Sequence, residues 1–286
     1  MLIGVFFGLA AAITFGLLDT LISYVSRVIG IWYVLVLAQI VSAILLFMFL
    51  EYSNRIQMAS PLILLLIGVS IGGANTLANL SLYNGLAIGP VALVSPIAAS
   101  YGLVTALFAV ILKHEHLYFF QTVGIIIIFT GIILTVEYKQ LSIAKMMQKH
   151  LGLFYGLGAM LGFGVEFFLL SIVSFQFGAI QPLLLSRTLS SIMLLVVSKS
   201  AGVKGWGKIT LKTLSVIFLV GLLDTIGMIF YDSGTLQAPA SVIAPISSIY
   251  TLIPLFFGVL FYREKLTLLQ WFGLLTIISG VLLLAL

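Results

Sequence analysis

The chain has 286 residues, of which 62% are hydrophobic and only 7% are charged. A soluble domain carries roughly 25% charged residues, so this composition excludes a water-soluble globular protein. The net charge of +5 lies mostly in predicted loops and does not indicate a nucleic-acid partner, and the absence of cysteine excludes disulfides, thiolate metal sites and cysteine nucleophiles.

Apolar runs of about 20 residues, the length that crosses a bilayer as a helix, recur along the whole chain. The alternation with a period of two that is typical of membrane β-barrels is absent. Because Met1 runs directly into apolar sequence without a basic segment, we expect no cleavable signal peptide. The sequence therefore predicts an all-α, multi-pass integral membrane protein. Its ten transmembrane helices are expected at about 3–24, 30–50, 60–82, 90–112, 118–137, 151–173, 178–198, 213–232, 239–261 and 267–286.

The second half of the chain repeats the first. A shift of 149 takes Pro239–Leu283 onto Pro90–Leu134 without a gap, and matches prolines, tyrosines, glutamines and glycines that rarely align by chance. We expect residues 1–137 and 151–286 to form two five-helix halves, joined by a loop at 138–150. Five spans is an odd number, so the second half must lie upside down relative to the first. Inverted repeats are typical of secondary transporters, with the substrate site at the repeat interface.

Prolines and tyrosines recur together in the fourth and ninth predicted spans. Pro96, Pro245 and Pro254 lie inside spans, where a missing N–H permits a kink. Kinked helices beside a cavity and purely structural bends are equal alternatives. Tyr101 and Tyr250 follow the first two prolines by five residues and are repeat-related. They are candidates for an aromatic wall around a substrate, with ordinary packing as the alternative.

Glycines recur in the fifth and tenth predicted spans. Gly124 and Gly131 are seven residues apart and so share one helix face, as do Gly273 and Gly280. Small residues let transmembrane helices approach closely. We favour packing within the bundle for these glycines over a seam between two copies of the chain.

Each half ends with a proline-bearing span, a charged loop, and a span with one glutamine and two spaced glycines. The loops read His114-Glu115-His116-Leu117 and Arg263-Glu264-Lys265-Leu266. In these features the chain resembles the drug/metabolite transporter superfamily, in its ten-helix EamA-type branch. The resemblance covers essentially the whole chain and implies a transporter, but that superfamily moves amino acids, sugars, nucleotide sugars, amines and drugs. The usual loop triplet there is Gly-Glu-Arg, whereas His114 and Arg263 stand at the glycine position here.

Four ionisable residues fall inside predicted spans, where a charge costs at least a few kcal/mol and needs a partner, a cavity or a function. They are Asp19, Glu166, Arg187 and Asp224. One interpretation pairs Arg187 with Glu166 or Asp224 as a buried ion pair that fixes helix packing. The interpretation that we favour places the pair in a central cavity, where a spare carboxylate binds a cationic substrate group or carries a proton.

Other polar residues are secondary candidates. Gln39, Asn75 and Asn79 would bond either to substrate or between helices. Asp232 closes the eighth predicted span, where we expect its side chain to reach water. The histidines are expected to be solvated, and their spacing does not indicate a metal site; they are His114, His116 and His150.

Basic residues are distributed unevenly between the predicted loops. Loops after even-numbered spans hold only Arg55 and Lys113. Loops after odd-numbered spans hold Arg27, Lys139, Lys145, Lys149, Lys199, Lys204, Lys208, Lys212, Arg263 and Lys265. The positive-inside rule then places both chain ends outside, whereas the family resemblance implies both ends inside. The orientation stays open at this point.

These features predict a secondary transporter in the plasma membrane that moves a small polar metabolite by alternating access. The acidic excess of the membrane charges favours amines, amino acids or related solutes over anions. A proton carried by Glu166 or Asp224 is the expected driving force, with exchange or facilitated diffusion as alternatives, because no nucleotide-binding motif is present. Export of drugs or sugars is the alternative within the fold. A membrane enzyme or a non-transporting sensor is a further alternative, but Asp224 lacks a Gly-x-Gly-Asp setting. We expect no cofactor, and either a monomer or a homodimer.

Overall fold

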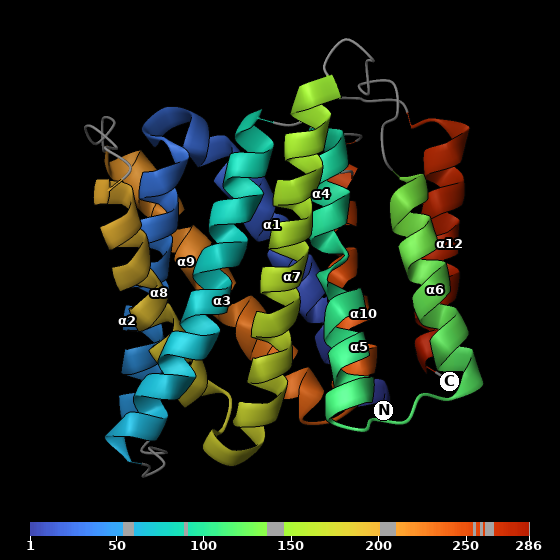
Figure 1. The fold of residues 1–286 in the computed structure, drawn as a ribbon, viewed down its shortest axis with the longest axis horizontal. Coiled ribbons are helices and arrows are strands. Elements are labelled where there is room, and N and C mark those ends of the chain that lie inside the picture. The colour runs from blue at the N-terminus through green and yellow to red at the C-terminus, as the bar shows by residue number, and fades with distance from the viewer. Residues whose placement is uncertain are drawn as a thin grey trace.

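The computed structural model describes residues 1–53, 60–88, 91–135, 146–200, 210–253, 256–257, 260 and 266–285. Throughout these residues the chain is helical, and the longer helices stand side by side along a common direction (Figure 1). The helices are α1 (Leu2–Ile29), α2 (Ile31–Ser53), α3 (Pro61–Ile88), α4 (Val91–Ala99), α5 (Tyr101–Leu112), α6 (Phe119–Leu134), α7 (Met146–Phe177), α8 (Ile180–Ser200), α9 (Leu211–Thr235), α10 (Ala240–Ser247), the 3-10 helix η3 (Ser248–Thr251) and α12 (Leu268–Ala285).

Seven helices in the described ranges are long and apolar enough to cross a membrane, and they are α1, α2, α3, α7, α8, α9 and α12. Three further apolar segments are shorter, at Pro96–Leu112, Phe119–Leu134 and Ala240–Thr251. The prediction of an all-helical membrane protein is therefore confirmed. Several helices run beyond their predicted ends, because helical hydrogen bonding continues through polar residues. α3, for example, continues past its predicted end at residue 82 to Ile88 and includes Asn84, whose side-chain amide also donates to the Leu80 carbonyl (2.7 Å).

The fourth and ninth predicted spans are not single helices. Pro96 lies inside α4, and the helix is interrupted at Ser100 before α5 begins. Pro245 lies inside α10, which passes into the tighter η3 three residues later. A proline lacks the N–H that would bond the carbonyl four residues before it, so it weakens its helix, and both changes lie about one turn from a proline. Pro254, like Glu264, lies outside the described residues.

Two repeat-related glycines form the turns at the ends of α1 and α7. Gly30 and Gly178 have φ values of 86° and 69°, a left-handed conformation that residues with a Cβ adopt at a cost. A glycine at this position ends each helix and redirects the chain within a few residues. In both halves the first two helices are therefore joined by a very short connection.

Helices of one half pack mainly against helices of the other. α1 packs on α9 and α3 packs on α7, while α2 packs on α8, α5 on α10 and α6 on α12. Exchanging the two halves turns the α1–α9 contact into the α7–α3 contact and leaves the α2–α8 and α6–α12 pairs unchanged. The interface thus has the pattern of a two-fold relation.

The glycines of the fifth and tenth predicted spans lie in the α6–α12 contact. A Cβ added at Gly124 would lie 2.9 Å from the carbonyl oxygen of Gly280, and one added at Gly131 would lie 2.8 Å from that of Gly273. The two pairs run in opposite order along the helices, so α6 and α12 are antiparallel. The prediction that these glycines pack within the bundle is confirmed, and the pair forms one edge of the molecule (Figure 1).

Candidate functional site

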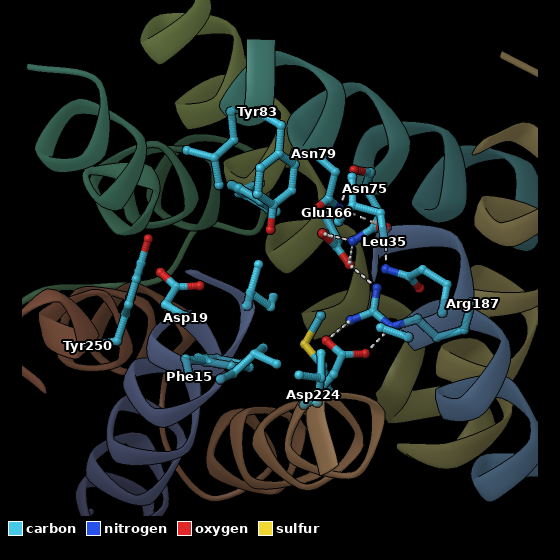
Figure 2. Close-up of a pocket in the computed structure, with 18 of the residues that line it drawn as sticks. Phe15, Asp19, Leu35, Asn75, Asn79, Tyr83, Glu166, Arg187, Asp224 and Tyr250 are labelled. Atoms are coloured by element: carbon cyan, nitrogen blue, oxygen red, sulfur yellow. Dashed lines mark hydrogen bonds and ion pairs between the residues drawn. The ribbon is translucent and has the colours of Figure 1, made fainter. Parts of the chain in front are cut away.

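Arg187 of α8 joins two carboxylates from neighbouring helices at the centre of the bundle. Its Nη1 donates to Oε1 of Glu166 on α7 (3.0 Å), and its Nη2 donates to Oδ1 of Asp224 on α9 (3.1 Å). Nε also lies 2.9 Å from Oδ2 of Asp224, an ionic contact that is poorly aligned for a hydrogen bond. Arg187 and Glu166 are buried, whereas the Asp224 side chain is 16% exposed. One arginine therefore faces two acids, as Figure 2 shows.

Asn75 of α3 extends this network into the first half. Its Nδ2 lies 3.0 Å from each carboxylate oxygen of Glu166. Its Oδ1 accepts hydrogen bonds from Gln39 Nε2 (3.2 Å), Ser190 Oγ (2.8 Å) and Asn79 Nδ2 (3.2 Å). The three amide residues singled out from the sequence are thus bonded to one another, and the network connects α2 and α3 with α7 and α8.

Asp19 of α1 stands apart from this network. It has no hydrogen-bond or ion-pair partner among the residues that the structure describes. It lines the same cavity as Glu166, Arg187 and Asp224, with the rings of Tyr250 and Phe15 on its side of the cavity (Figure 2). The cavity has a volume of about 100 Å³, which is room for several water molecules or a small solute.

Repeat-related residues line this cavity together. A shift of 148 or 149 connects seven pairs of lining residues: Phe15 and Phe163, Leu18 and Glu166, Asp19 and Phe167, Gln39 and Arg187, Asn75 and Asp224, Asn79 and Met228, and Tyr101 and Tyr250. The cavity therefore lies where the two halves meet. Most of the pairs differ in charge or polarity, so the scaffold is symmetric and the chemistry is not.

Aromatic rings form a layer along one wall of the cavity. Tyr101 stacks on Phe167 (ring centroids 4.6 Å apart) and on Tyr250 (6.3 Å), and Phe167 packs edge-on against Tyr231 (4.4 Å). The Tyr101 hydroxyl lies 2.9 Å from Ser247 Oγ. Both predicted tyrosines thus line the cavity and also pack in the core, and a role around a substrate stays a prediction.

Comparisons with known proteins agree with this architecture. The sequence profile of the EamA-like transporter family matches residues 2–137 and again residues 150–286. The chain belongs to the EamA-like transporter family. The resemblance to the drug/metabolite transporter superfamily, in its EamA-type branch, is thereby confirmed, and the chain is a multi-pass membrane protein of a family of transporters.

Among solved structures, one crystal structure whose title names no function aligns with this EamA-like protein at a TM-score of 0.80. The alignment covers 98% of this chain and 95% of the other chain at 11% sequence identity. At that identity the likeness shows the fold alone. No curated protein matches the sequence.

The loop glutamate of the EamA-type pattern has a defined structural contact. Glu115 accepts hydrogen bonds from the backbone N–H groups of Ala240 (3.2 Å) and Ser241 (2.9 Å) at the start of α10, and from Ser241 Oγ (2.7 Å). Lys113 Nζ lies 2.9 Å away. Burial by itself would raise the pKa of Glu115, but these hydrogen bonds and the lysine outweigh it and hold the pKa below its usual range. The sequence indicated this glutamate only as part of a loop motif. His114 and His116 beside it are exposed, as expected.

One residue of this EamA-like chain was placed wrongly from its sequence. Asp232 was expected to reach water at the end of its span, but its side chain is fully buried. The reason is that α9 continues to Thr235 and α10 then folds back beside it. Sequence reasoning also missed Tyr83, which lines the cavity. Its repeat equivalent is Asp232, so no matched pair of aromatic residues indicated it.

Proposed function

We propose that this protein is a secondary transporter whose two halves, residues 1–137 and 151–286, are inverted repeats that expose the central cavity to each side of the membrane in turn. The repeat-related pairs that line the cavity support this, because they place the pseudo-two-fold relation through it. The exchange of packing partners between the halves supports it too. In this proposal the interrupted segments α4–α5 and α10–η3 each count as one of ten spans. An even number of spans brings a chain back to the side on which it started. The two chain ends lie at the same end of the bundle, in agreement with this (Figure 1).

The substrate that the cavity suits best is a small polar metabolite with a positively charged group, such as an amine or an amino acid. The observation that carries this is the carboxylate of Asp19, which is unpartnered among the described residues and faces the cavity. Glu166 and Asp224 are both engaged by Arg187, so they are less available to a substrate. Three acids against one arginine leave the lining with an acidic excess, which attracts cations and disfavours anions.

The aromatic side chains of the lining fit the same class of solute. Tyr250 and Phe15 lie close to Asp19 (Figure 2), and a cation over an aromatic face is stabilised by about 0.5–2 kcal/mol, more when water is excluded. A hydrocarbon portion of the solute would pack on the same rings. The hydrogen bonds around Arg187 fix the positions of the polar side chains on the other side of the cavity. A solute larger than the cavity would require the helices to separate.

The driving force in this proposal is an ion gradient, most simply of protons, or exchange of one solute for another. The proposed location is the plasma membrane. Because the glycine faces of α6 and α12 contact each other, they do not offer the dimer seam that was the alternative for them. The proposal applies equally to a monomer and to a homodimer.

Ligand-dependent melting of the purified protein in detergent tests the substrate class. A ligand that binds only the folded state raises the melting temperature, with about 2.7 kcal/mol of added stability at one hundred times its Kd. Amines, amino acids and sugars are compared on the parent protein and on the variants Asp19→Asn, Glu166→Gln and Asp224→Asn. We expect an amine or amino acid to stabilise the parent, and Asp19→Asn to lose this stabilisation.

The matched control for this experiment is Glu51→Gln, which removes an exposed carboxylate at the end of α2. It should keep the full ligand response. Equal stabilisation of all variants by an amine would show that Asp19 does not bind it. Stabilisation by sugars alone would contradict the cationic substrate.

A further inference from the structure

Asp232, near the end of α9, is a buried acid that the proposed substrate cavity does not use. It does not line the cavity, and its side chain is completely shielded from solvent. Its Oδ2 accepts a hydrogen bond from Ser174 Oγ of α7 (3.0 Å), and Ser174 is itself buried. Its Oδ1 has no hydrogen-bond partner. Among the described acids, this combination of complete burial and one orphaned oxygen is found only at Asp232.

An ionised carboxylate in this position would lack the compensation that buried charges need. Glu166, which is equally buried, accepts hydrogen bonds from Arg187 and Asn75, whereas Asp232 has one hydroxyl donor. A buried unpaired charge costs several kcal/mol even after relaxation, and proteins avoid this cost by neutralising the group. A carboxyl group that carries a proton has no net charge to compensate. The arrangement around Asp232 therefore suits the protonated acid.

Other charged groups do not replace the missing partner. Glu166 of α7 and Arg187 of α8 interact with Asp232 electrostatically with opposite signs, and they belong to the central network. α10 and the first four turns of α1 contain no acidic or basic side chain, and Glu51 of α2 is exposed. The amino terminus at Met1 is also at this end, because Gly4 packs against Gly234, and Met1 is exposed. Tyr231 is buried, and its hydroxyl donates to the Phe167 carbonyl. Glu115 and Lys113 form an ion pair with each other, and Glu115 binds the start of α10.

Asp232 lies near the end of the bundle at which α7 and α9 end. It lies one turn from the end of α9, and Ser174 lies one turn from the end of α7. The aromatic layer of Tyr101, Phe167 and Tyr231 is packed between this end and the central network. Water at this end is excluded from Asp232, although the helix ends are only a few residues away.

The cavity extends towards the opposite end of the bundle. A second hollow, lined in part by Trp32 at the start of α2 and by Asn84 near the end of α3, shares Leu35 and Tyr83 with the cavity. The structure is therefore closed at the end that holds Asp232 and hollowed towards the other. Alternating access requires the closed end to open, and opening there would bring water to Asp232.

We propose that Asp232 is a proton-binding site, separate from the substrate cavity, which holds its proton while its end of the transporter is closed and releases it to water when that end opens. Ser174 stabilises the carboxylate that remains after release, because its hydroxyl donates to Oδ2. The proton returns to the same carboxyl group from bulk water before the end closes again. One proton bound at Asp232 thus ties the closing of this end to the pH of the water on its own side of the membrane, and no proton crosses the membrane in this step. The inference rests on the proposed alternating access and identifies the site at which pH controls it.

Cysteine labelling at both ends of the bundle tests this, since the chain contains no native cysteine. Ser171→Cys places a buried reporter on α7 at the closed end, and Asn84→Cys places one in the open hollow. The ratio of the Ser171→Cys rate to the Asn84→Cys rate for a maleimide, taken at the same pH, removes the pH dependence that the two thiols share. The same ratio measured in Asp232→Asn, which is neutral at every pH, corrects for the different titration of the buried thiol. We expect the ratio to rise several-fold more in the parent than in Asp232→Asn as the pH is raised, because loss of the proton disfavours the closed end.

Ser174→Ala and infrared spectroscopy keep the test decisive if Asp232→Asn folds poorly. Without the hydroxyl donor the carboxylate is less stable, so Ser174→Ala should move the rise in the ratio to more alkaline pH. The infrared carbonyl band of a protonated carboxylic acid should be present in the parent at neutral pH and in Asp224→Asn, and reduced in Asp232→Asn.

A ratio that does not change with pH, or that rises equally in Asp232→Asn, would overturn the proposal, as would sodium dependence in place of pH dependence. Neither readout needs a substrate, so failure here and failure of amine binding at Asp19 are separate results.

Discussion

Arg187 shows how one residue sets the charge of the centre. Its guanidinium contacts Glu166 and Asp224 from different edges, and Asn75 donates to Glu166 from a third helix. A planar group with several donors suits this task better than a lysine, which is a point charge. With Arg187 taken up in this way, the free acid of the cavity is Asp19. The ion pairs of Arg187 and the proposed substrate site at Asp19 are therefore parts of the same lining, each with its own carboxylates.

Replacement of Arg187 by methionine should destabilise the protein. Two buried or half-buried acids would lose their cation, and removal of one member of a buried pair costs about 3–5 kcal/mol. We expect a clearly lower melting temperature in detergent for Arg187→Met. The double variant Arg187→Met with Glu166→Gln should recover part of the loss, because one uncompensated charge is then removed.

The matched control is Lys199→Met, which removes an exposed basic residue from the last turn of the same helix. Its melting temperature should stay near that of the parent, since exposed charges contribute little. If Arg187→Met melted like the control, the two acids would not depend on the arginine.

At the scale of single elements, the start of α10 is held by a residue from the other half. The first N–H groups of a helix have no partner within the helix, and an acid placed there satisfies them and interacts favourably with the helix dipole. Glu115 does this for Ala240 and Ser241 from the loop between α5 and α6. The contact therefore joins the two halves at a helix that continues into η3, whose Tyr250 lines the cavity.

Glu115→Gln should make stability less dependent on acid pH. The pKa of Glu115 is lower in the folded protein than the ordinary glutamate value of 4.5. Its stabilisation is therefore present above that value and is lost as the pH falls through the lower, folded-state pKa. At neutral pH we expect the variant to be about 1 kcal/mol less stable, at the low end for charge-assisted hydrogen bonds because water partly screens the site. Melting temperatures of both proteins across the acid range measure this, and the two curves should converge at low pH.

Glu51→Gln again serves as the control, since Glu51 is an exposed acid without a helix to cap. It should follow the parent across the whole range. A constant gap between Glu115→Gln and the parent down to low pH would mean that the charge of Glu115 does not contribute.

At the scale of the whole molecule, the two-fold pattern of contacts accounts for both the cavity and its closed end. Gly124 with Gly280 and Gly131 with Gly273 bring α6 and α12 together in antiparallel fashion. The α1–α9 and α3–α7 contacts exchange in the same way, and the α2–α8 contact maps onto itself. In the proposed mechanism such a scaffold closes either end with equivalent helices, whereas Asp19 and Asp232, which have no acidic repeat equivalents, act only once each.

The proposed ten spans make a prediction about sidedness. If every span crosses the membrane, α1 starts and α12 ends on one side, and α8 ends on the other. Single cysteines at Leu2, Ala285 and Ser200 in sealed vesicles are then labelled by an impermeant maleimide from different sides. We expect Leu2→Cys and Ala285→Cys to behave alike and Ser200→Cys to behave in the opposite way. Labelling of all three from one side would contradict the proposed topology, and the side that reacts also decides the orientation of the chain ends.

The class of the fold and its division into halves followed from the sequence, because hydropathy, odd-numbered spans and matched prolines and glycines are local features that persist in any arrangement of the helices. The positions of Glu166, Arg187 and Asp224 inside long apolar helices followed for the same reason. The helix interruptions after Pro96 and Pro245 were indicated by the prolines themselves, while the ends of α1 and α3 were not, because helices continue past the last apolar residue.

The pairing of side chains was decided only by the tertiary structure. Hydropathy places a residue at a depth in the membrane, but the rotation and tilt of each helix decide which neighbour its side chain meets. That is why both Glu166 and Asp224 contact Arg187 while Asp19 remains free in the cavity. It is also why Asp232, one turn from a helix end, is buried against Ser174 and not exposed to water.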